Sequence, residues 1–409
     1  MTTPYLTRTL EPLLLQSARE FPAITLTGPR QSGKTTLLKH LFADTHDYVS
    51  LSVPDTRAWA LRAPQDFLAS HPAPVILDEI TYAPDLLHYV MDLIDNDRDA
   101  KGQFIITGSQ NLGLVAAITE SLAGRTDVLR LFPLTERELR GEPDRSLPWD
   151  RPADIARESL RPSVRVAWDT FLRGYYPEVA LDPGRDAYRW QAAYVATYLE
   201  QDVSSLRAVG DRFAFQTFMQ MLAARTATVL DLSSLSRDIG VSVNTVKAWL
   251  SVLDATHQIF MLRPDARNLS RRMVKRPKVY FTDVGLVCHL TGLKDAEHAA
   301  RGPMAGQLVE NAVMAEVYKT YAHLGLTPSM SFWRTATGLE VDLVIRDGGR
   351  TVPVEIKSAG TVNRRWADGL RTFRSTQNGD EVDRGYVVFP GADPVGLGEG
   401  ALAIPFGEL

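Results

Sequence analysis

Short apolar segments alternate with stretches of helical spacing through the first third of the chain. Five of these segments are rich in β-branched residues and bounded by glycine, proline or polar residues, at 24–27, 48–53, 74–80, 103–109 and 127–131. Strands that alternate with helices in this way form a parallel sheet with helices on both faces. The pattern therefore predicts a doubly wound α/β domain over residues 1–140.

The pattern becomes helical in the middle of the chain. Residues 141–162 combine four prolines with many charged residues and are expected to form a linker. Residues 164–225 have helical spacing and many aromatic side chains, which indicate a helical core more readily than a base-stacking surface. We therefore expect a linker and a helical region over residues 141–225.

Residues 230–250 are typical of a helix-turn-helix. A short helix stops at Gly240, and a second helix begins with serine and asparagine caps and continues with helical apolar spacing. Two segments of strand character, 259–262 and 278–282, follow and would form a wing. The pattern predicts a winged helix over residues 226–300.

The segment between these two strands is basic. It carries six cations and no acid in twelve residues: Arg267, Arg271, Arg272, Lys275, Arg276 and Lys278. Because the net charge of the chain is −4, any attraction for nucleic acid has to come from such a local patch. Residues 267–278 are therefore the expected contact with DNA. The alternative is a winged helix that contacts proteins, with its basic hairpin exposed to solvent.

The C-terminal segment combines an amphipathic helix with several strands. The helix begins near residue 306 and bears Glu310, and a hairpin follows with Asp342 on its second strand. The next strand carries Glu355 and Lys357 on one face, because side chains repeat every two residues along a strand. We expect an α/β domain over residues 301–409.

The composition, 44% hydrophobic and 23% charged, is that of a globular protein, and its length favours about two to three domains. The one cysteine, Cys288, excludes an internal disulfide and a cysteine-cluster metal site. No apolar run approaches the length of a membrane span, and the N-terminus lacks a signal-peptide pattern. We therefore expect a soluble, cytoplasmic protein that has no membrane partner.

One loop carries the sharpest chemical signal. The motif G-x-x-x-x-G-K-[ST] follows the first strand and opens a helix, over Gly28, Pro29, Arg30, Gln31, Ser32, Gly33, Lys34, Thr35 and Thr36. The glycines let backbone N–H groups point at the phosphates of a nucleotide, and the helix dipole adds to the attraction. Lys34 would reach the β- and γ-phosphates, and Thr35 would bind Mg²⁺. The motif predicts a nucleotide site; the alternative is a chance glycine loop.

Two later strands of the predicted sheet also end in polar residues. Asp78 would orient the Mg²⁺ ion, and Glu79 would polarise the water that attacks the γ-phosphate. Thr107 or Ser109 would sense the γ-phosphate, or would cap a helix. Arg125 would complete a nucleotide site, either its own or that of a neighbouring subunit, or would be a surface or structural arginine.

Together these motifs resemble those of the prokaryotic AAA-type ATPases that carry a C-terminal domain of unassigned function. The resemblance extends over nearly the whole chain, through residues 26–36, 77–79, 107–109, 121–125, 174–178, 198–203 and 278–286. It implies an AAA+ core that uses ATP and Mg²⁺, in a homo-oligomer such as a hexameric ring. It does not define a biological task.

Glu310, Asp342, Glu355 and Lys357 resemble the active site of the PD-(D/E)xK nuclease superfamily, which has a restriction-endonuclease-like fold. The resemblance implies that Asp342 and Glu355 bind Mg²⁺ or Mn²⁺ and that Glu310 assists as an outer ligand. Lys357 would then position or activate the water that attacks a phosphodiester. The alternative is an inactive domain that only binds.

The function expected from the sequence is an ATP-driven motor that processes DNA held by the winged helix and the nuclease-like domain. The alternative is a nucleotide-dependent switch that recruits partners, with an inactive nuclease-like domain. A motor should hydrolyse ATP faster when DNA is present, whereas a switch should turn over slowly and without regard to DNA.

Overall fold

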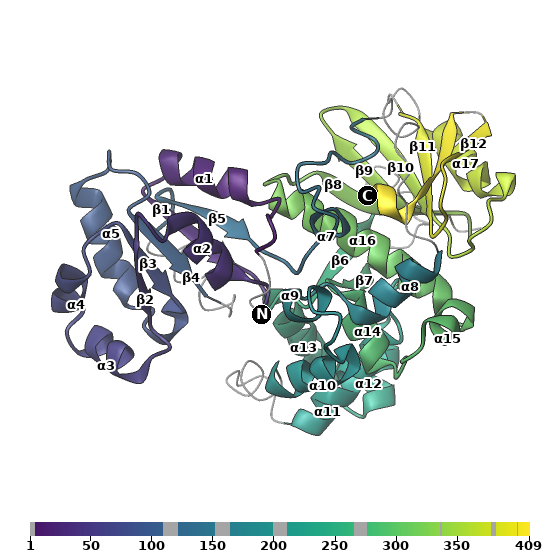
Figure 1. The fold of residues 1–409 in the computed structure, drawn as a ribbon. Coiled ribbons are helices and arrows are strands. Elements are labelled where there is room, and N and C mark those ends of the chain that lie inside the picture. Colours follow the sequence, from purple (N-terminus) through teal and green to yellow (C-terminus); the bar gives the residue numbers. More distant parts are fainter. Residues whose placement is uncertain are drawn as a thin grey trace.

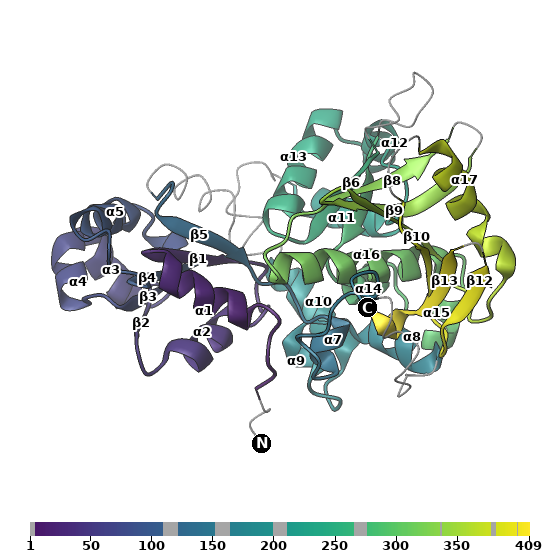
Figure 2. The same ribbon diagram turned by 90° about the horizontal axis from the view of Figure 1, so that it is seen from above.

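The computed structural model describes residues 5–108, 122–151, 164–198, 211–265, 276–335, 338–377, 382–398 and 400–409. Two β-sheets organise these residues, and each lies with its own helices at one end of the molecule (Figures 1 and 2). In this part of the chain, no helix is long and apolar enough to cross a membrane.

The N-terminal sheet is parallel throughout and has the order β2-β3-β4-β1-β5. Its strands are β1 (Ala23–Thr27), β2 (Asp47–Ser50), β3 (Val75–Asp78), β4 (Phe104–Thr107) and β5 (Thr126–Arg130). One face packs against α1 (Glu11–Glu20) and α2 (Lys34–Phe42). The other face packs against α3 (Pro54–Arg62), α4 (Pro64–Ser70) and α5 (Leu86–Asn96). The doubly wound α/β arrangement expected from the sequence is confirmed.

Alternate strand residues face the two helical layers. Ile24 and Leu26 pack with α1 and α2, whereas Leu77 and Ile106 pack with the layer on the opposite face. Burial on both faces explains why these strands are nearly continuous apolar runs in the sequence. The helical stretch after β2 is divided into α3 and α4, because Pro64 lacks an N–H group and cannot continue the first helix.

Helices form the middle of the chain. They are α7 (Glu136–Leu139), α8 (Val164–Arg173), α9 (Pro177–Ala180), α10 (Ala187–Tyr198) and α11 (Arg212–Ala223). Most of the aromatic residues singled out in the sequence are buried in one core, including Trp168, Phe171, Trp190, Tyr194, Phe215 and Phe218. The aromatic set therefore serves packing and not base stacking.

A helix-turn-helix follows, with α12 (Leu232–Ile239) and α13 (Val243–Ala255). Gly240 ends α12 in the left-handed conformation, with φ of 80°. Ser242 caps α13, because its Oγ accepts a hydrogen bond from the N–H of Thr245 at 3.0 Å. An antiparallel hairpin of β6 (Ile259–Pro264) and β7 (Lys278–Phe281) comes next in the chain.

This hairpin is the edge of the C-terminal sheet, which has the order β12-β13-β11-β10-β9-β8-β6-β7. The other strands are β8 (Ser329–Arg334), β9 (Glu340–Asp347), β10 (Arg350–Ile356), β11 (Gly385–Phe389), β12 (Val395–Gly398) and β13 (Ala401–Pro405). The helices around the sheet are α14 (Val284–Leu290), α15 (Ala296–Arg301), α16 (Ala305–His323) and α17 (Asp368–Thr376). Because β8 pairs with the outer edge of β6, residues on both sides of position 300 share one sheet.

A close backbone contact joins the helical region to α14. The Cα atom of Gly174 would lie 2.6 Å from any Cβ added at Gly285, so a side chain does not fit there. Asp283 completes the contact, because its carboxylate accepts hydrogen bonds from the N–H groups of Tyr175 (2.7 Å) and Leu286 (3.0 Å). Two glycines and one aspartate therefore set the distance between these segments.

We expect Gly285→Ala to lower the free energy of unfolding by about 1–3 kcal/mol, because the new methyl group overpacks a backbone contact. The matched control is Gly306→Ala in α16, where an added Cβ meets no atom within 4 Å. Because alanine favours a helix over glycine, this control should be neutral or stabilising by up to about 1 kcal/mol. Urea unfolding of both variants measures the difference, and equal stabilities would contradict the assigned contact.

Candidate functional site

The phosphate-binding loop joins β1 to α2. Gly28 has φ of 145°, and a Cβ at this position would lie 2.1 Å from the carbonyl oxygen of Leu131. Only glycine therefore fits the start of the loop. At the other end Gly33 precedes α2 with φ of 97°, and Lys34 begins the helix. The Nζ of Lys34 donates hydrogen bonds to the carbonyl oxygens of Gly28 (3.0 Å) and Pro29 (2.9 Å), so its ammonium lies over the loop.

Asp78 lies at the C-terminal end of β3, beside the loop. Its Oδ2 accepts a hydrogen bond from the Thr35 hydroxyl at 3.2 Å, and its Oδ1 accepts one from Thr107 at 2.5 Å. The hydroxyl of Tyr48 also donates to Asp78, a contact that the sequence analysis missed. A hydroxyl and a carboxylate at this distance are the hard oxygen donors that Mg²⁺ prefers, so Thr35 and Asp78 fit the ion. Bound Mg²⁺ would neutralise phosphate charge.

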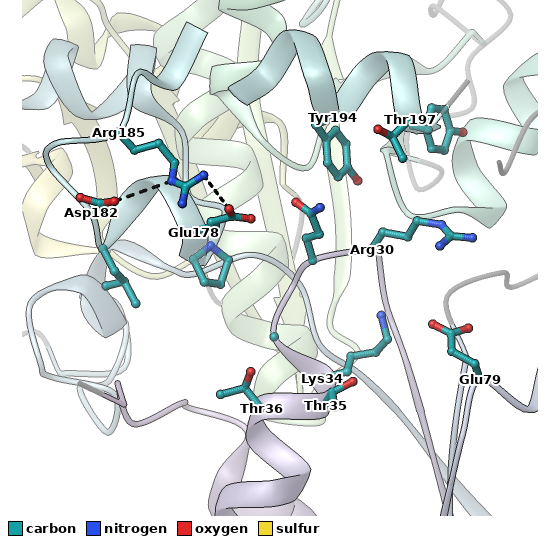
Figure 3. A pocket seen from close by; sticks show the side chains of 15 residues that line it. Arg30, Lys34, Thr35, Thr36, Glu79, Glu178, Asp182, Arg185, Tyr194 and Thr197 are labelled. Carbon is teal, nitrogen blue, oxygen red and sulfur yellow. Dashed lines mark ion pairs between the residues drawn. The ribbon is translucent and has the colours of Figure 1, made fainter. Parts of the chain in front are cut away.

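Glu79 follows Asp78 in the left-handed conformation, with φ of 58°. This conformation is uncommon for a residue with a side chain and concentrates at functional sites. The backbone N–H of Glu79 lies 3.5 Å from Oγ1 of Thr107, the residue at the end of β4. The turn places the Glu79 side chain at the edge of the cleft, to one side of Lys34 and Thr35 (Figure 3).

This cleft has a volume of about 730 Å³, within the range of sites that bind small molecules. The phosphate loop and Glu79 form one wall, and α9, α10 and the turn between them form the other (Figure 3). From the second wall Arg185 pairs with Glu178 at 2.7 Å and Asp182 at 3.7 Å. Tyr194 and Thr197 of α10 face the loop from the same side. No local pattern in the sequence indicated that the helical region completes the cleft.

The sequence analysis also did not identify two further residues, Arg8 and His257. Arg8 donates from Nη1 to the carbonyl oxygen of Ser32 at 3.0 Å and so holds the loop from its rear. His257, next to the end of α13, is buried, and its burial and the charges of Arg130 and Lys34 lower its pKa to about 3. A neutral imidazole therefore lies within electrostatic range of Lys34.

Arg125, predicted to complete a nucleotide site, lies away from this cleft. The carbonyl oxygen of Arg125 accepts a hydrogen bond from the N–H of Ala23, at the start of β1 and thus at the opposite edge of the sheet from the loop. Its guanidinium binds Asp95, with distances of 2.7 and 2.9 Å. The geometry gives Arg125 no role at its own nucleotide site, and action on a neighbouring copy stays a prediction. Ser109 lies outside the described residues.

The C-terminal sheet brings together the four residues singled out there. Glu310 comes from α16, Asp342 from β9 and Glu355 from β10, and Lys357 follows β10. Asp342 accepts a hydrogen bond from the N–H of Ile356 at 2.8 Å, and Lys357 donates to Glu355 at 2.5 Å. The predicted arrangement of one helix and two strands is therefore present.

Two residues of β7 enter the same cluster. The Nζ of Lys278 lies 2.8 Å from Glu310, 2.5 Å from Glu340 and 3.9 Å from Asp342. Tyr280 donates a second hydrogen bond to Glu310 at 2.7 Å. Lys278 and Tyr280 share one face of the strand because they are two residues apart, a pattern that the sequence analysis could have noticed.

Burial dominates the electrostatics of this cluster. It raises the pKa of Glu310 to about 7 and that of Glu355 to about 8, and the charge of Asp342 adds to both shifts. Burial alone would lower the pKa of Lys278, but Glu310, Asp342 and Glu340 hold it above its ordinary value. Lys278 is therefore a permanent cation among these carboxylates.

The predicted metal site does not fit this arrangement. The described residues contain no group of three or more histidine, cysteine, aspartate or glutamate side chains placed to hold a metal ion. Glu310, Asp342 and Glu355 were expected to be such a group. The physical reason for the difference is that ammonium groups already pair with two of these carboxylates: Lys278 binds Oε1 of Glu310, and Lys357 binds Oε1 of Glu355.

The same observation corrects the expected DNA contact. Lys278 was counted in the basic segment 267–278, but its side chain is only 4% exposed and cannot reach a phosphate backbone. Arg276 is exposed and pairs with Asp231 at 2.6 Å. Arg267, Arg271, Arg272 and Lys275 lie outside the described residues, so their contact with DNA stays a prediction.

Comparison with protein families divides the chain into three matched segments. Residues 20–140 match an AAA domain. Residues 165–297 match a domain of unknown function, DUF8612, and residues 305–409 match another, DUF4143. The boundary between the two later matches lies close to the start of α16.

Two curated relatives are similar over most of the chain. They are the uncharacterized proteins Rv2008c of Mycobacterium tuberculosis and Mb2031c of Mycobacterium bovis, each 26% identical over 397 residues, with 97% of this chain and 82% of the relative covered. Among solved structures, the Walker-type ATPase PABY2304 of Pyrococcus abyssi is 16% identical, with a TM-score of 0.43 over 68% of this chain and 94% of that one. A variant of RuvB from Thermotoga maritima is 17% identical, with a TM-score of 0.27 over 63% and 88%.

The AAA match covers the strands, the phosphate loop and the Asp78–Glu79 turn described above. The match and the geometry agree on the same residues. Residues 20–140 are therefore a P-loop ATPase domain of the AAA type, in which Thr35 and Asp78 fit the Mg²⁺ ion that would accompany ATP.

Proposed function

We propose that this protein hydrolyses ATP in the cleft between the phosphate loop and α10, and that the nucleotide state of this cleft controls DNA binding by the helix-turn-helix. The observation that supports the coupling is a set of buried polar contacts between α10 and the end of α13. A nucleotide in the cleft would touch α10, and α10 contacts the end of the second helix of the helix-turn-helix.

These contacts involve two tyrosines of α10 and two residues that follow α13. The Tyr198 hydroxyl lies 2.8 Å from Oγ1 of Thr256, and Nε2 of Gln258 donates to the Tyr194 hydroxyl at 3.1 Å. All four side chains are buried, so both hydrogen bonds are shielded from water. A shift of α10 would therefore move the end of α13 with it.

The other end of α13 is suited to DNA. Asn244, Lys247 and Ser251 are exposed along one side of the helix, whereas Val246 and Trp249 are buried against the core. In helix-turn-helix proteins the N-terminal residues of the second helix contact base edges in the major groove. Asn244 and Lys247 occupy this part of α13.

Two modes of action follow from the same cleft. In the first, the protein is a motor, assembled in a ring such as a hexamer, whose turnover drives movement on DNA. In the second, it is a switch whose C-terminal domain binds partners and does not cleave. The cation-filled carboxylate cluster favours the second mode for that domain, and no observation in the described residues favours DNA cleavage.

The experiment that tests the proposal is the rate of ATP hydrolysis with and without single-stranded, duplex and branched DNA, together with DNA affinity in the presence of ATP and of ADP. Coupling predicts that DNA changes the rate or that nucleotide changes the affinity. If neither changes in a folded protein that hydrolyses ATP, the proposed coupling is wrong.

The catalytic role of Glu79 gives a first prediction. We expect Glu79→Gln to slow turnover by roughly 10²-fold, because it removes the general base, while ATP still binds. Lys34→Ala should instead weaken ATP binding itself. The matched control is Glu20→Gln on the exposed end of α1, which should hydrolyse ATP at the wild-type rate. Wild-type turnover by the Glu79 variant would remove this residue from the mechanism.

The coupling contact gives a second prediction. Thr256→Val keeps the shape of the side chain and removes the hydroxyl that meets Tyr198, so we expect basal hydrolysis to persist while the effect of DNA falls several-fold. Thr372→Val in α17 is the matched control, because its hydroxyl also donates to the carbonyl oxygen four residues earlier and lies outside the cleft and α13. If DNA changes the hydrolysis rate of Thr256→Val as much as that of wild type, the contact between Tyr198 and Thr256 does not carry the coupling.

DNA binding by α13 gives a third prediction. We expect Lys247→Ala to weaken DNA binding and to reduce the slope of log affinity against log salt by about one, since one phosphate contact is lost. Lys101→Ala, exposed beyond the far end of the N-terminal sheet, should change neither quantity. Fluorescence anisotropy at several salt concentrations measures both, and equal slopes for wild type and Lys247→Ala would assign DNA binding elsewhere.

A further inference from the structure

We propose that Lys278 takes the place of the divalent metal ion in the nuclease-like cluster, so that the C-terminal domain holds its carboxylates together without metal and does not cleave DNA. This inference goes beyond the proposed function and does not depend on ATP hydrolysis or on DNA binding by α13. It begins with the position of the Lys278 ammonium.

The ammonium lies where the carboxylates converge. Its Nζ is 2.8 Å from Glu310 on α16 and 2.5 Å from Glu340 on β9. Asp342, the predicted metal ligand on β9, is 3.9 Å away. Mg²⁺ would need oxygens of these carboxylates at about 2.0–2.1 Å, and the positive charge of Lys278 beside Glu310 and Asp342 opposes its approach.

The lysine is also held firmly. Its side chain is only 4% exposed, and its ammonium lies 5.5 Å from the centroid of the Phe332 ring. To admit a metal ion, Lys278 would have to leave two carboxylates and find another buried partner. Removing one member of a buried ion pair costs about 3–5 kcal/mol, so metal entry at the expense of Lys278 is unfavourable.

The second lysine of the cluster supports the same conclusion. In a metal-dependent site Lys357 would be available to act on a water molecule. Its Nζ instead donates to Glu355 at 2.5 Å, on the carboxylate expected to bind the metal. Lys278 and Lys357 thus place two ammonium groups among the four carboxyl groups of the cluster, and each lysine pairs with at least one of them.

This arrangement has a structural purpose. Lys278 and Tyr280 lie on β7, which belongs to the hairpin that follows the helix-turn-helix, and both bind Glu310 of α16. Lys278 also pairs with Glu340 of β9, so one lysine joins β7, α16 and β9. The cluster therefore fastens the hairpin that follows the helix-turn-helix to α16 and β9.

The test is a Mn²⁺ titration of the nucleotide-free full-length protein, followed by calorimetry. We expect wild type and Asp342→Asn to give the same isotherm, since neither binds Mn²⁺ at this cluster more tightly than about 1 mM. We expect Lys278→Met to gain a Mn²⁺ site at least ~10-fold tighter, which the added Asp342→Asn change removes. Lys247→Met, an exposed lysine, is the control and should gain nothing.

Thermal unfolding gives a second readout. Mn²⁺ should raise the melting temperature of Lys278→Met and leave that of wild type unchanged, because only the variant lacks a cation in the cluster. Lys278→Arg keeps a cation and should behave as wild type toward Mn²⁺. No Mg²⁺- or Mn²⁺-dependent DNA cleavage should occur in wild type.

Several outcomes would overturn the inference. A Mn²⁺ ion that binds wild type but not Asp342→Asn would show a metal site that coexists with Lys278. A folded Lys278→Met protein that gains no Mn²⁺ would show that the lysine does not stand in for a metal. If Lys278→Met fails to fold, the comparison of wild type with Asp342→Asn still decides whether the cluster binds Mn²⁺ in the presence of Lys278. ATP turnover of each protein, measured separately, distinguishes these results from failure of the proposed function.

Discussion

A buried ion pair between Arg8 and Glu138 holds the parts of this protein around the phosphate loop. Nε of Arg8 lies 3.1 Å from Glu138, and neither side chain is appreciably exposed. Burial alone would raise the pKa of Glu138, but Arg8 and His323 hold it well below its ordinary range, so the carboxylate stays charged. Arg8 also binds the loop at Ser32. Because His323 ends α16, the nucleotide loop is tied through one carboxylate to the helix that supports the C-terminal sheet.

Local patterns in the sequence were sufficient for the nucleotide loop and much of the fold. The loop motif identifies the residues of the phosphate loop directly. The strands of the N-terminal sheet are apolar on both faces and were recognised from that pattern. Asp78 and Glu79, at the end of one such strand, could therefore be placed at the edge of the sheet beside the loop. The helix-turn-helix was equally predictable, because Gly240 and Ser242 act within a few residues of themselves. In each of these cases, the residues that determine the local structure lie within a few positions of it in the sequence.

Contacts between distant segments could not be predicted in this way. The second wall of the cleft comes from α9 and α10, and nothing near Arg185 or Tyr194 in the sequence points to the phosphate loop. Lys278 was assigned to a basic DNA-binding segment because its neighbours are basic. Its true surroundings depend on β6 pairing with β8, which brings β7 over α16. The role of a charged residue such as Lys278 therefore depends on which other charged residues the topology brings close to it.

Lys34 and Lys278 show how the surroundings decide the role of a buried lysine. Lys34 is held by the carbonyl oxygens of Gly28 and Pro29, and net contributions of such hydrogen bonds are about 0.5–1.5 kcal/mol each. A phosphate group can replace them, because it offers the ammonium a stronger, charged partner. Lys278 is already paired with carboxylates, so an anionic ligand offers it little and a cation is repelled. The first lysine can therefore exchange partners with the nucleotide state, whereas the second holds one arrangement of the C-terminal sheet.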